Sequence, residues 1–274
     1  MSITDNSPAQ WRLPPLKTAD HKYTRGHAVV LGGATMTGAS RLAAHAAQRA
    51  GAGLVTLVAP EAAWPVYAAS LLSIIARPWE AAAWATLLAD DRVTAILIGP
   101  GAGHTELTRH AIETALGSGK HLLLDADAIT LLAKDSLLRK AVKAAILTPH
   151  EGEYAAIAAA CGLDVQADKP TRALALAKAL NSTVLLKGPE TFIAAVDGRI
   201  ARNANAPAWL ATGGTGDVLS GIITGLLAQG MSPFDAACAG AWLQGEAAQH
   251  YGPGMVAEDL LTAIPAALAV AEQG

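Results

Sequence analysis

Short runs of apolar residues alternate along the chain with stretches in which apolar residues recur at helical spacing. The runs predict buried β-strands because they are short, continuous and bounded by Gly, Pro or acidic residues. They fall within residues 27–33, 54–60, 93–101, 121–128, 144–153 and 182–191. Between the first two runs, "ASRLAAHAAQRAG" (39–51) predicts a helix. This alternation predicts an α/β fold with a mostly parallel central sheet that helices cover on both faces.

One predicted pair of strands departs from the alternation. The stretch "FIAAVDGRIARN" (192–203) predicts a hairpin that turns at Asp197 and Gly198. No internal repeat, low-complexity tract or linker divides the chain, so we expect a single domain over residues 26–274. The Pro-containing segment 1–25 is expected to be an N-terminal extension of that domain.

Polar residues and glycines follow directly after the apolar runs. The runs lead into "GPGAGH" (99–104), "DADA" (125–128), "TPHEGE" (148–153) and "KGPET" (187–191). In an open α/β sheet, ligands bind outside the carboxyl ends of the strands. The pattern therefore predicts one site that is assembled from several loops.

The segment "LATGGTGDVLSG" (210–221) carries one acid, Asp217, directly before an apolar helical pattern. Asp217 could be a helix N-cap, which stabilises by about 1 kcal/mol. A cap does not explain the glycines before it, which indicate that the backbone approaches another group closely. Successive amides at a helix start bind anions, and this predicts an anion hole from Gly213, Gly214, Thr215 and Gly216.

An acid beside an anion hole would repel a phosphate unless it had another task. Orienting and deprotonating a hydroxyl that attacks the phosphate is such a task, and we favour this role for Asp217 over the cap. The positive end of the helix dipole is expected to keep Asp217 ionised and therefore weakly basic.

Two other glycine-rich turns do not match the established nucleotide-binding motifs that they resemble. In "GGATMTGAS" (32–40) Ala39 stands where a P-loop requires Lys, and in "GPGAGH" His104 stands where a dinucleotide fingerprint requires Gly. Both turns remain candidates for ligand contact after a strand. In the second turn, Gly101 and Gly103 are equally good candidates.

Four charged residues and one histidine follow other strands. Asp125 is as well explained by a site carboxylate as by a turn, whereas Asp127 is better explained as a cap of the next helix. His150 suits ligand contact better than the core, and Glu153 suits either a water-mediated Mg²⁺ contact or the first turn of a helix. The pattern H-x-x-E is too short for a zinc site. Lys187 is expected at the mouth of a cleft, near a nucleotide phosphate, or else on the surface.

Composition narrows the classes of function. Apolar residues make up 52% of the chain and charged residues 16%, which favours a well-buried core over disorder. The net charge of -3 argues against nucleic acid as a partner. No apolar run of about 18 residues predicts a membrane span, and the polar start predicts no signal peptide, so we expect a cytoplasmic protein. Cys161 and Cys238 lack zinc-site spacing and are expected to be buried, reduced thiols.

Taken together, these motifs resemble the ribokinase-like superfamily and, within it, the ADP-dependent NAD(P)H-hydrate dehydratases. The resemblance rests on "HAVVLGGATMTGAS", "LIGPGAG", "LLLDADAITLL", "ILTPHEGEYA", "VLLKGPETFIA" and "NAPAWLATGGTGDVLSG", and it covers most of residues 25–270. The histidine of "TPHEGE", where related kinases tend to carry Asn, points to the dehydratases. The resemblance implies a three-layer α/β/α sandwich.

The resemblance also implies a reaction and its residues. Asp217 would activate the ring hydroxyl of hydrated NADH or NADPH to attack the terminal phosphate of ADP, which Mg²⁺ accompanies. Loss of phosphate would then restore NAD(P)H and leave AMP. A homotetramer is implied, with an NAD(P)H-hydrate epimerase as a separate partner protein. The nucleotide would contact Lys187, Gly188, Pro189, Glu190, Thr191 and Gly216, and the hydrated cofactor would contact Ala39, Gly103, His150 and Asp217.

Three alternatives stay open at this point. A kinase for a hydroxymethylpyrimidine or a hydroxyethylthiazole would use the same anion hole and the same base. A dinucleotide-dependent oxidoreductase is disfavoured because Gly is missing at position 104. A nucleotide sensor without activity is disfavoured because Asp217 is present.

Overall fold

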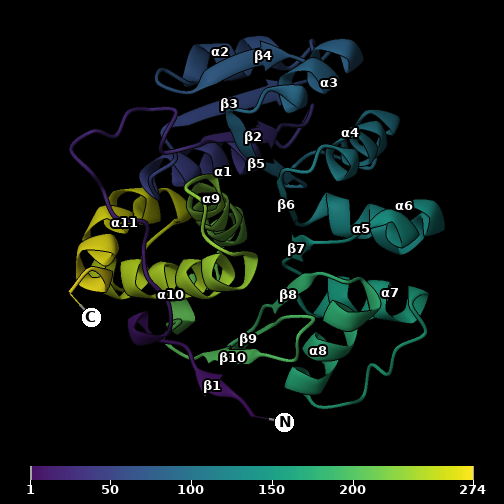
Figure 1. Cartoon of the computed structure of the whole chain (residues 1–274), viewed down its shortest axis with the longest axis vertical. Coiled ribbons are helices and arrows are strands. Elements are labelled where there is room, and N and C mark those ends of the chain that lie inside the picture. The colour runs from purple at the N-terminus through teal and green to yellow at the C-terminus, as the bar shows by residue number, and fades with distance from the viewer. Residues whose placement is uncertain (1, 274) are drawn as a thin grey trace.

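The computed structural model describes residues 2–273, and the strands of this range form one ten-stranded sheet (Figure 1). The strands are β1 (Thr4–Asp5), β2 (His27–Leu31), β3 (Leu54–Ala59), β4 (Ile75–Pro78), β5 (Val93–Ile98), β6 (His121–Leu124), β7 (Ala145–Leu147), β8 (Thr183–Leu186), β9 (Thr191–Ala194) and β10 (Ile200–Asn203). Their order across the sheet is β1-β10-β9-β8-β7-β6-β5-β2-β3-β4. The six apolar runs that predicted strands are β2, β3, β5, β6, β7 and β8, so that part of the prediction is confirmed.

Neighbouring strands from β8 to β4 are all parallel. β9 is antiparallel to both β8 and β10, which confirms the predicted hairpin around Asp197 and Gly198. Strand β4 was not predicted. It lies at the edge of the sheet, and its side chains are mostly exposed, so it lacks the continuous apolar run of a strand that is buried on both faces.

Helices cover both faces of the sheet. In Figure 1, α9, α10 and α11 lie to the left of the column of strands, and α4 to α8 lie to its right. The helices are α1 (Thr37–Arg49), α2 (Trp64–Ser70), α3 (Ala81–Ala89), α4 (Glu106–Gly117), α5 (Asp127–Lys134), α6 (Ser136–Ala141), α7 (Glu151–Ala160), α8 (Lys169–Ala179), α9 (Thr215–Ala228), α10 (Pro233–Tyr251) and α11 (Ala257–Ala271). The predicted three-layer α/β/α sandwich is therefore confirmed.

The two faces of the sheet form two separate hydrophobic cores. In β2, Ala28 and Val30 pack into the core that contains α1, α9, α10 and α11, whereas Val29 and Leu31 pack into the core of α3, α4, α5, α7 and α8. Alternate side chains of a strand point to opposite faces. A strand covered on both faces is thus apolar throughout, which is why the sequence shows continuous runs rather than alternation.

Small residues let the helices on one face approach closely. A Cβ atom at Gly221 of α9 would overlap the carbonyl oxygen of Ala43 in α1. This close approach explains the abundance of Ala and Gly in both helices, and it brings the start of α9 to the carboxyl ends of the strands.

The order of the strands sets the position of a site. β2 lies between β3 and β5, and the chain runs from β2 to one edge of the sheet before β5 to β8 extend to the other. In such sheets the ligand crevice lies at the carboxyl ends of the two strands where the direction changes. The loops after β2 and β5 therefore flank the expected site.

The beginning of the chain packs on the sheet. β1 pairs with β10, and Trp11 is buried in the core. The Trp11 indole donates to the side chain of Asn6 at 2.9 Å, and the Asn6 amide donates to Asn203 at 2.8 Å and to the Cys238 carbonyl at 2.7 Å. These contacts join the first residues of the predicted extension to the domain. Cys238 is a buried free thiol and Cys161 is half-buried.

A buried histidine makes the stability of the fold depend on pH. The His27 side chain lies at the start of β2, 2.8 Å from the Thr56 hydroxyl, and burial lowers its pKa from 6.5 to about 4. The unfolded chain therefore binds a proton more readily than the folded chain, and stability is lost as the pH falls from about 6.5 through 4.

We expect His27→Gln to reduce this acid sensitivity. A shift of this size corresponds to on the order of 2–3 kcal/mol between pH 7 and pH 4, and a glutamine does not titrate. Urea unfolding of both proteins across this pH range measures the difference. The exposed His250, changed to Gln, is the control. An identical pH dependence in the wild type and His27→Gln would contradict the assignment.

Candidate active site

Asp217 lies in the first turn of α9, as predicted, but it is not the cap of that helix. The N-cap position is occupied by Gly214, whose φ of 89° is left-handed, and Asp217 is the third helical residue. The cap hypothesis is therefore wrong. The carboxylate is free of capping bonds and thus available for chemistry.

The loop before α9 is held by its own side chains. The Thr215 hydroxyl donates to the carbonyls of Leu210 at 2.9 Å and Thr212 at 3.0 Å, and the Gln244 amide donates to the Thr215 carbonyl at 2.6 Å. The side chain of Thr215 is therefore committed to shaping the loop, and only its backbone remains for an anion.

The amides at the start of α9 point out of the helix. The first bond within the helix runs from the amide of Val218 to the carbonyl of Gly214 at 3.1 Å. The amides of Thr215, Gly216 and Asp217 precede it and have no carbonyl partner in the helix. Such a helix start is positive and suits an anion.

Lys187 reaches this helix start from the end of β8. Its ammonium lies 3.7 Å from the position that a Cβ atom on Gly216 would occupy, and 2.9 Å from the Asp125 carboxylate. Burial lowers the pKa of Lys187, but the carboxylates of Asp125 and Glu153 more than offset this, so the pKa is raised and the ammonium stays charged. The hypothesis of a surface lysine is therefore wrong.

Asp125 is the buried partner of this lysine. It follows β6 and is 1% exposed. One carboxylate oxygen accepts from Lys187, and the other accepts from the Ser220 hydroxyl at 2.6 Å. Burial raises the pKa of Asp125, but Lys187 and Ser220 lower it below its ordinary value. Both oxygens are occupied, so Asp125 is a structural counter-ion rather than a carboxylate that is free to react.

The environment of Asp217 raises its basicity. Burial, together with the negative charges of Asp125 and Asp127, outweighs the positive charge of Lys187 and raises the pKa of Asp217 to about 6. The expectation that the helix dipole keeps this acid weakly basic is therefore wrong. Loss of hydration on burial exceeds the favourable effect of the dipole, which is typically 0.3–1 kcal/mol. A carboxylate with this pKa is a competent general base near neutral pH.

The loops after β2 and β5 pack against each other beside this cluster. A Cβ atom at Gly33 would overlap the carbonyl oxygen of Gly101, and one at Gly101 would lie 3.3 Å from the Cβ atom of Ala39. At Gly103, by contrast, the nearest atom would be the Thr105 methyl group at 3.5 Å. Gly101 is therefore enclosed by protein, whereas Gly103 leaves room for a ligand.

Asp127 supports the turn of Gly103. Its carboxylate accepts the Gly103 amide at 2.8 Å and lies 3.1 Å from the His104 ring. Asp127 is the first residue of α5 rather than its cap, because the cap position is Ala126. The predicted capping role is wrong, and the carboxylate instead fixes the loop after β5.

His150 and Glu153 form a reciprocal capping box at the start of α7. His150 Nδ1 accepts from the amides of Gly152 at 3.0 Å and Glu153 at 3.2 Å, and the Glu153 carboxylate accepts from the His150 amide at 2.8 Å. The His150 ring is exposed, and its Nε2 lies 3.5 Å from the Glu153 carboxylate. The predicted place of Glu153 in the first turn of a helix is confirmed. The sequence did not indicate His150 as the cap, because His is not among the preferred cap residues.

Lys169, which the sequence did not single out, holds the turn between β8 and β9. Its ammonium donates to the carbonyls of Lys187 at 2.9 Å and Glu190 at 2.8 Å, and it pairs with Glu151 at 3.3 Å. Lys169 begins α8 and follows no strand, so neither a motif nor its position along the chain indicated this contact. These three contacts fix the backbone of residues 187–191, the segment that is expected to contact a nucleotide.

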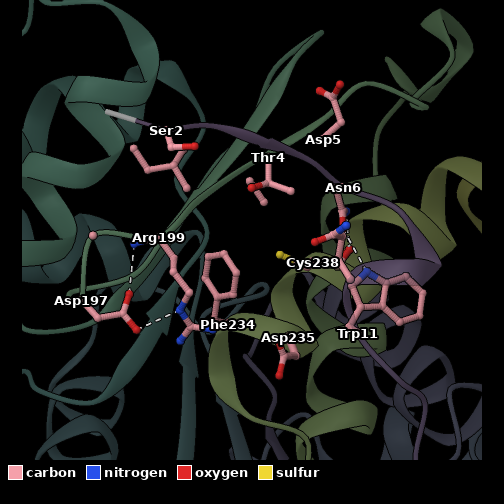
Figure 2. Close-up of a pocket in the computed structure, with 14 residues that line it drawn as sticks. Ser2, Thr4, Asp5, Asn6, Trp11, Asp197, Arg199, Phe234, Asp235 and Cys238 are labelled. Carbon is pink, nitrogen blue, oxygen red and sulfur yellow. Dashed lines mark hydrogen bonds and ion pairs between the residues drawn. The ribbon is translucent and has the colours of Figure 1, made fainter.

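A separate cavity lies far from these residues in the fold. It has a volume of about 450 Å³ and is bounded by the N-terminal segment, the β9–β10 turn and the start of α10 (Figure 2). The Arg199 guanidinium stacks over the Phe234 ring there, 4.4 Å from the centroid, and pairs with Asp197. None of the predicted site residues lines this cavity, so the cluster around Asp217 is the better candidate for the active site.

Fold and site together define a ribokinase-like protein. A structure of a ribokinase-like superfamily protein from Enterococcus faecalis matches 99% of this chain and 97% of its own length with a TM-score of 0.87 at 23% identity. The chain belongs to the NAD(P)H-hydrate dehydratase family, whose model matches residues 28–266. This family membership favours the dehydratase hypothesis over the alcohol-kinase alternative.

Curated relatives and a solved structure agree with this family. The ADP-dependent (S)-NAD(P)H-hydrate dehydratase of Neisseria meningitidis is 38% identical over 83% of this chain and 78% of its own. The bifunctional NAD(P)H-hydrate repair enzyme of Salinibacter ruber is 36% identical over 96% of this chain, which spans about half (51%) of that relative. The dehydratase of Bacillus subtilis co-crystallised with ATP and Mg²⁺ matches 99% of this chain and 100% of its own, with a TM-score of 0.83 at 29% identity.

Between residues 2 and 273, no helix is long and apolar enough to cross a membrane. Over the same range, no three His, Cys, Asp or Glu side chains converge as a metal site would require.

Proposed function

We propose that this protein dehydrates hydrated NADH or NADPH at the expense of ADP and thereby restores the reduced cofactor. The observation that carries the proposal is the cluster at the start of α9, where Asp217, a positive helix end and the Lys187 ammonium lie together. A base beside an anion site is what the transfer of a phosphoryl group to a hydroxyl requires. Membership of the dehydratase family supports the assignment of this hydroxyl to the hydrated nicotinamide ring.

In the first step, the ring hydroxyl oxygen attacks the terminal phosphorus of ADP. The hydroxyl proton passes to the Asp217 carboxylate, a new P–O bond forms, and the bond to AMP breaks. The negative charge that develops on the transferring group is met by the amides of residues 213–216 and by Lys187. Both are in place before reaction, because Thr215 shapes the loop and Asp125 holds the lysine.

In the second step, the phosphorylated ring loses phosphate. The C–O bond breaks with its electron pair on phosphate, and the neighbouring ring carbon gives up a proton to the departing phosphate, so the double bond returns. Phosphate is a far better leaving group than hydroxide, which is why phosphorylation makes the dehydration feasible. The products are NAD(P)H, AMP and phosphate.

The proposed contacts divide between two ligands. The nucleotide meets the turn after β8 and the start of α9, through Lys187, Gly188, Pro189, Glu190, Thr191 and Gly216. The hydrated cofactor meets the start of α1, the loop after β5, the start of α7 and the start of α9, through Ala39, Gly103, His150 and Asp217. The open space at Gly103 and the exposed ring of His150 support this side of the assignment.

Mg²⁺ accompanies ADP in this proposal. Mg²⁺ keeps several waters and is typically held by substrate phosphates with one or two carboxylates, so the absence of three converging acids among residues 2–273 is compatible with it. Glu153, whose charge acts on Lys187, would hold the waters of the ion. The ion would neutralise phosphate charge.

The activity is tested with hydrated NADH and ADP. We expect reduced-nicotinamide absorbance to recover, with one AMP and one phosphate released per cofactor restored. ATP in place of ADP determines the nucleotide preference, and hydrated NADPH determines the cofactor preference. No recovery with either nucleotide would refute the proposed function, and accumulation of a phosphorylated product without recovery would indicate a kinase.

We further propose a homotetramer that acts in the cytoplasm on the NAD(P)H pool, with an NAD(P)H-hydrate epimerase as its functional partner. The resemblance to the family supports the assembly, and the bifunctional name of the Salinibacter ruber relative supports the linked activity. Light scattering on the purified protein measures the assembly, and adding an epimerase to a mixture of both hydrate epimers tests the partnership.

The hydrogen bonds of Lys169 to the turn between β8 and β9 predict that a change of this residue weakens nucleotide binding. Lys169→Met removes two charge-assisted hydrogen bonds to the turn at 187–190, so we expect the KM for ADP to rise by roughly tenfold or more, with a smaller change in kcat. Steady-state kinetics measures both. Lys178→Met, an exposed lysine on the same helix, is the matched control. An unchanged KM for ADP in Lys169→Met would show that the hydrogen bonds of Lys169 do not shape the nucleotide site.

A further inference from the structure

A basic groove lies at the end of the sheet opposite to Asp217. It has a volume of about 600 Å³ and is bounded by Arg25, the last two turns of α1, the loop after α2 and Pro265 of α11. Arg25 precedes β2 and Arg49 ends α1, so the groove lies at the amino ends of the strands. We propose that this groove binds a diphosphate group, either that of a nucleotide or free pyrophosphate. The inference does not depend on the proposed function.

The groove is lined by basic side chains without acids. Arg25, His45 and Arg49 line it, and among residues 2–273 no Asp or Glu lines it with them. Glu272 shares an adjoining hollow with Arg25 and Arg49 but forms no ion pair within 4 Å with either. The chain as a whole has 23 acids against 20 Lys and Arg residues. A groove with basic groups alone therefore differs from the average surface of this protein and suits an anion.

One side of α1 concentrates these charges. Arg41, His45 and Arg49 follow one another at intervals of four residues, and like charges at this spacing destabilise a helix. The His45 ring is half-buried, and its pKa is lowered by burial, by Arg49 and by Arg41, with no acid of residues 2–273 acting against them. An anion in the groove would offset this repulsion.

Arg25 brings a guanidinium that the protein itself leaves unused. Its side chain is half-buried, and its Nε atom is buried without a hydrogen-bond partner among residues 2–273. Buried donors without a partner are uncommon in native proteins. The guanidinium fork matches the oxygens of a phosphate, so a phosphate would supply this side chain with both an acceptor and a counter-charge.

The walls of the groove are held by hydrogen bonds. The Gln229 amide at the end of α9 donates to the carbonyls of Ala50 and Gly225, both at 2.9 Å, and so ties the end of α1 to α9. The Ser73 hydroxyl donates to the side-chain oxygen of Gln48 at 2.9 Å and ties the loop after α2 to α1. The groove is therefore formed before a ligand arrives, which lowers the cost of binding.

Charge and size together select the class of ligand. Two arginines are charged at every physiological pH, and a diphosphate group carries more than one negative charge, with oxygens for a bidentate contact to each guanidinium. The volume of the groove is within the range of small-molecule sites. Leu72, which is 97% exposed, and Pro265 add apolar surface at the rim, against which the organic part of a nucleotide can lie.

The test is an NMR titration of the His45 imidazole with pyrophosphate, in about 0.15 M NaCl so that weak surface attraction is screened. His45→Gln assigns the signals. We expect pyrophosphate to move them, and we expect Arg49→Gln and Arg25→Gln each to weaken this binding by roughly tenfold or more. Pyrophosphate that binds only near Asp217 would leave the His45 signals in place, and that result would overturn the proposal.

The exposed Arg77 of the edge strand β4 provides the matched control, because it does not line the groove. Arg77→Gln removes the same charge as Arg49→Gln and should leave the affinity unchanged. If both variants weakened binding equally, the effect would be one of overall charge and the proposal would be wrong. Arg49 is exposed, so its change is expected to leave the fold intact even if Arg25→Gln does not fold.

A second titration with ADP identifies the source of the diphosphate. Movement of the His45 signals at lower concentrations of ADP than of pyrophosphate assigns the groove to a nucleotide, and the reverse order assigns it to the free anion. Both orders support a diphosphate site, whereas no movement with either compound refutes it. No step requires turnover, so failure of the protein to restore hydrated NADH would leave this result unaffected.

Discussion

Asp217→Asn is expected to lower turnover of hydrated NADH by about 10²–10⁴-fold while the fold is preserved. An asparagine cannot accept the hydroxyl proton, and the geometry around it is unchanged because Asp217 makes no capping bond. In the wild type, activity should rise as the pH increases through about 6, where the carboxylate ionises. Single-turnover kinetics with ADP across pH 5–8 measures both effects.

The same substitution is expected to stabilise the protein at neutral pH. The folded pKa of Asp217 is about 6, above the ordinary 3.8, so the folded chain holds the proton more tightly than the unfolded chain. The associated stability is fully present below about 4 and is lost as the pH rises through 6. The asparagine variant carries no such loss, and we expect it to be more stable by on the order of 1–3 kcal/mol at pH 8.

Urea unfolding at pH 4 and pH 8 tests this linkage. The difference between the two proteins should be large at pH 8 and should nearly vanish at pH 4. Asp91→Asn, at a fully exposed acid, is the matched control and should change neither stability nor turnover. Full activity in Asp217→Asn would show that this residue is not the base, and equal stability at both pH values would contradict its raised pKa.

Gly214→Ala is expected to have the largest effect on stability. Gly214 has a φ of 89°, and a Cβ atom there would lie 2.8 Å from the Ala257 side chain and 2.9 Å from that of Leu42. Backbone strain and overpacking together should destabilise the fold by roughly 2–5 kcal/mol. The start of α9 would shift, so the activity of the remaining folded protein should also fall.

Gly162→Ala separates the effect of backbone strain from the effect of overpacking. Gly162 has a similar φ of 69°, but nothing lies within 4 Å of the position of its Cβ atom, and it ends α7 away from the proposed site. We expect backbone strain alone to lower the free energy of unfolding of this variant by roughly 1–2 kcal/mol, and we expect its activity to be retained. Thermal unfolding of both variants measures the difference. If Gly214→Ala were no less stable than Gly162→Ala, the close approach to α1 and α11 would not constrain the loop.

Local patterns in the sequence were enough to predict the layers of the fold and to point to the candidate site. A buried parallel strand is apolar on both faces, so β2, β3, β5, β6, β7 and β8 could be found from continuous apolar runs alone. The glycines before Asp217 likewise signal a close backbone approach within a few residues. These features depend on neighbours along the chain, and the sequence records them directly.

Properties that depend on residues far apart in the chain could not be predicted from local sequence patterns. Asp125 remained undecided between a turn and a site carboxylate because its partners lie 62 and 95 residues away in the chain. That Gly101 is enclosed while Gly103 is open depends on the position of α1, and the contacts of Lys169 with the turn after β8 depend on the packing of α8.

The sequence by itself determined the α/β layers, the loops that carry the site and the helix start beside Asp217. Only the tertiary structure decided which of these groups are charged, paired or free. The helix dipole predicted a weak base at Asp217, whereas burial beside Asp125 raises its pKa to about 6. The reason is physical. Hydration and charge act through space, and the burial of a carboxylate is set by every element that packs around it.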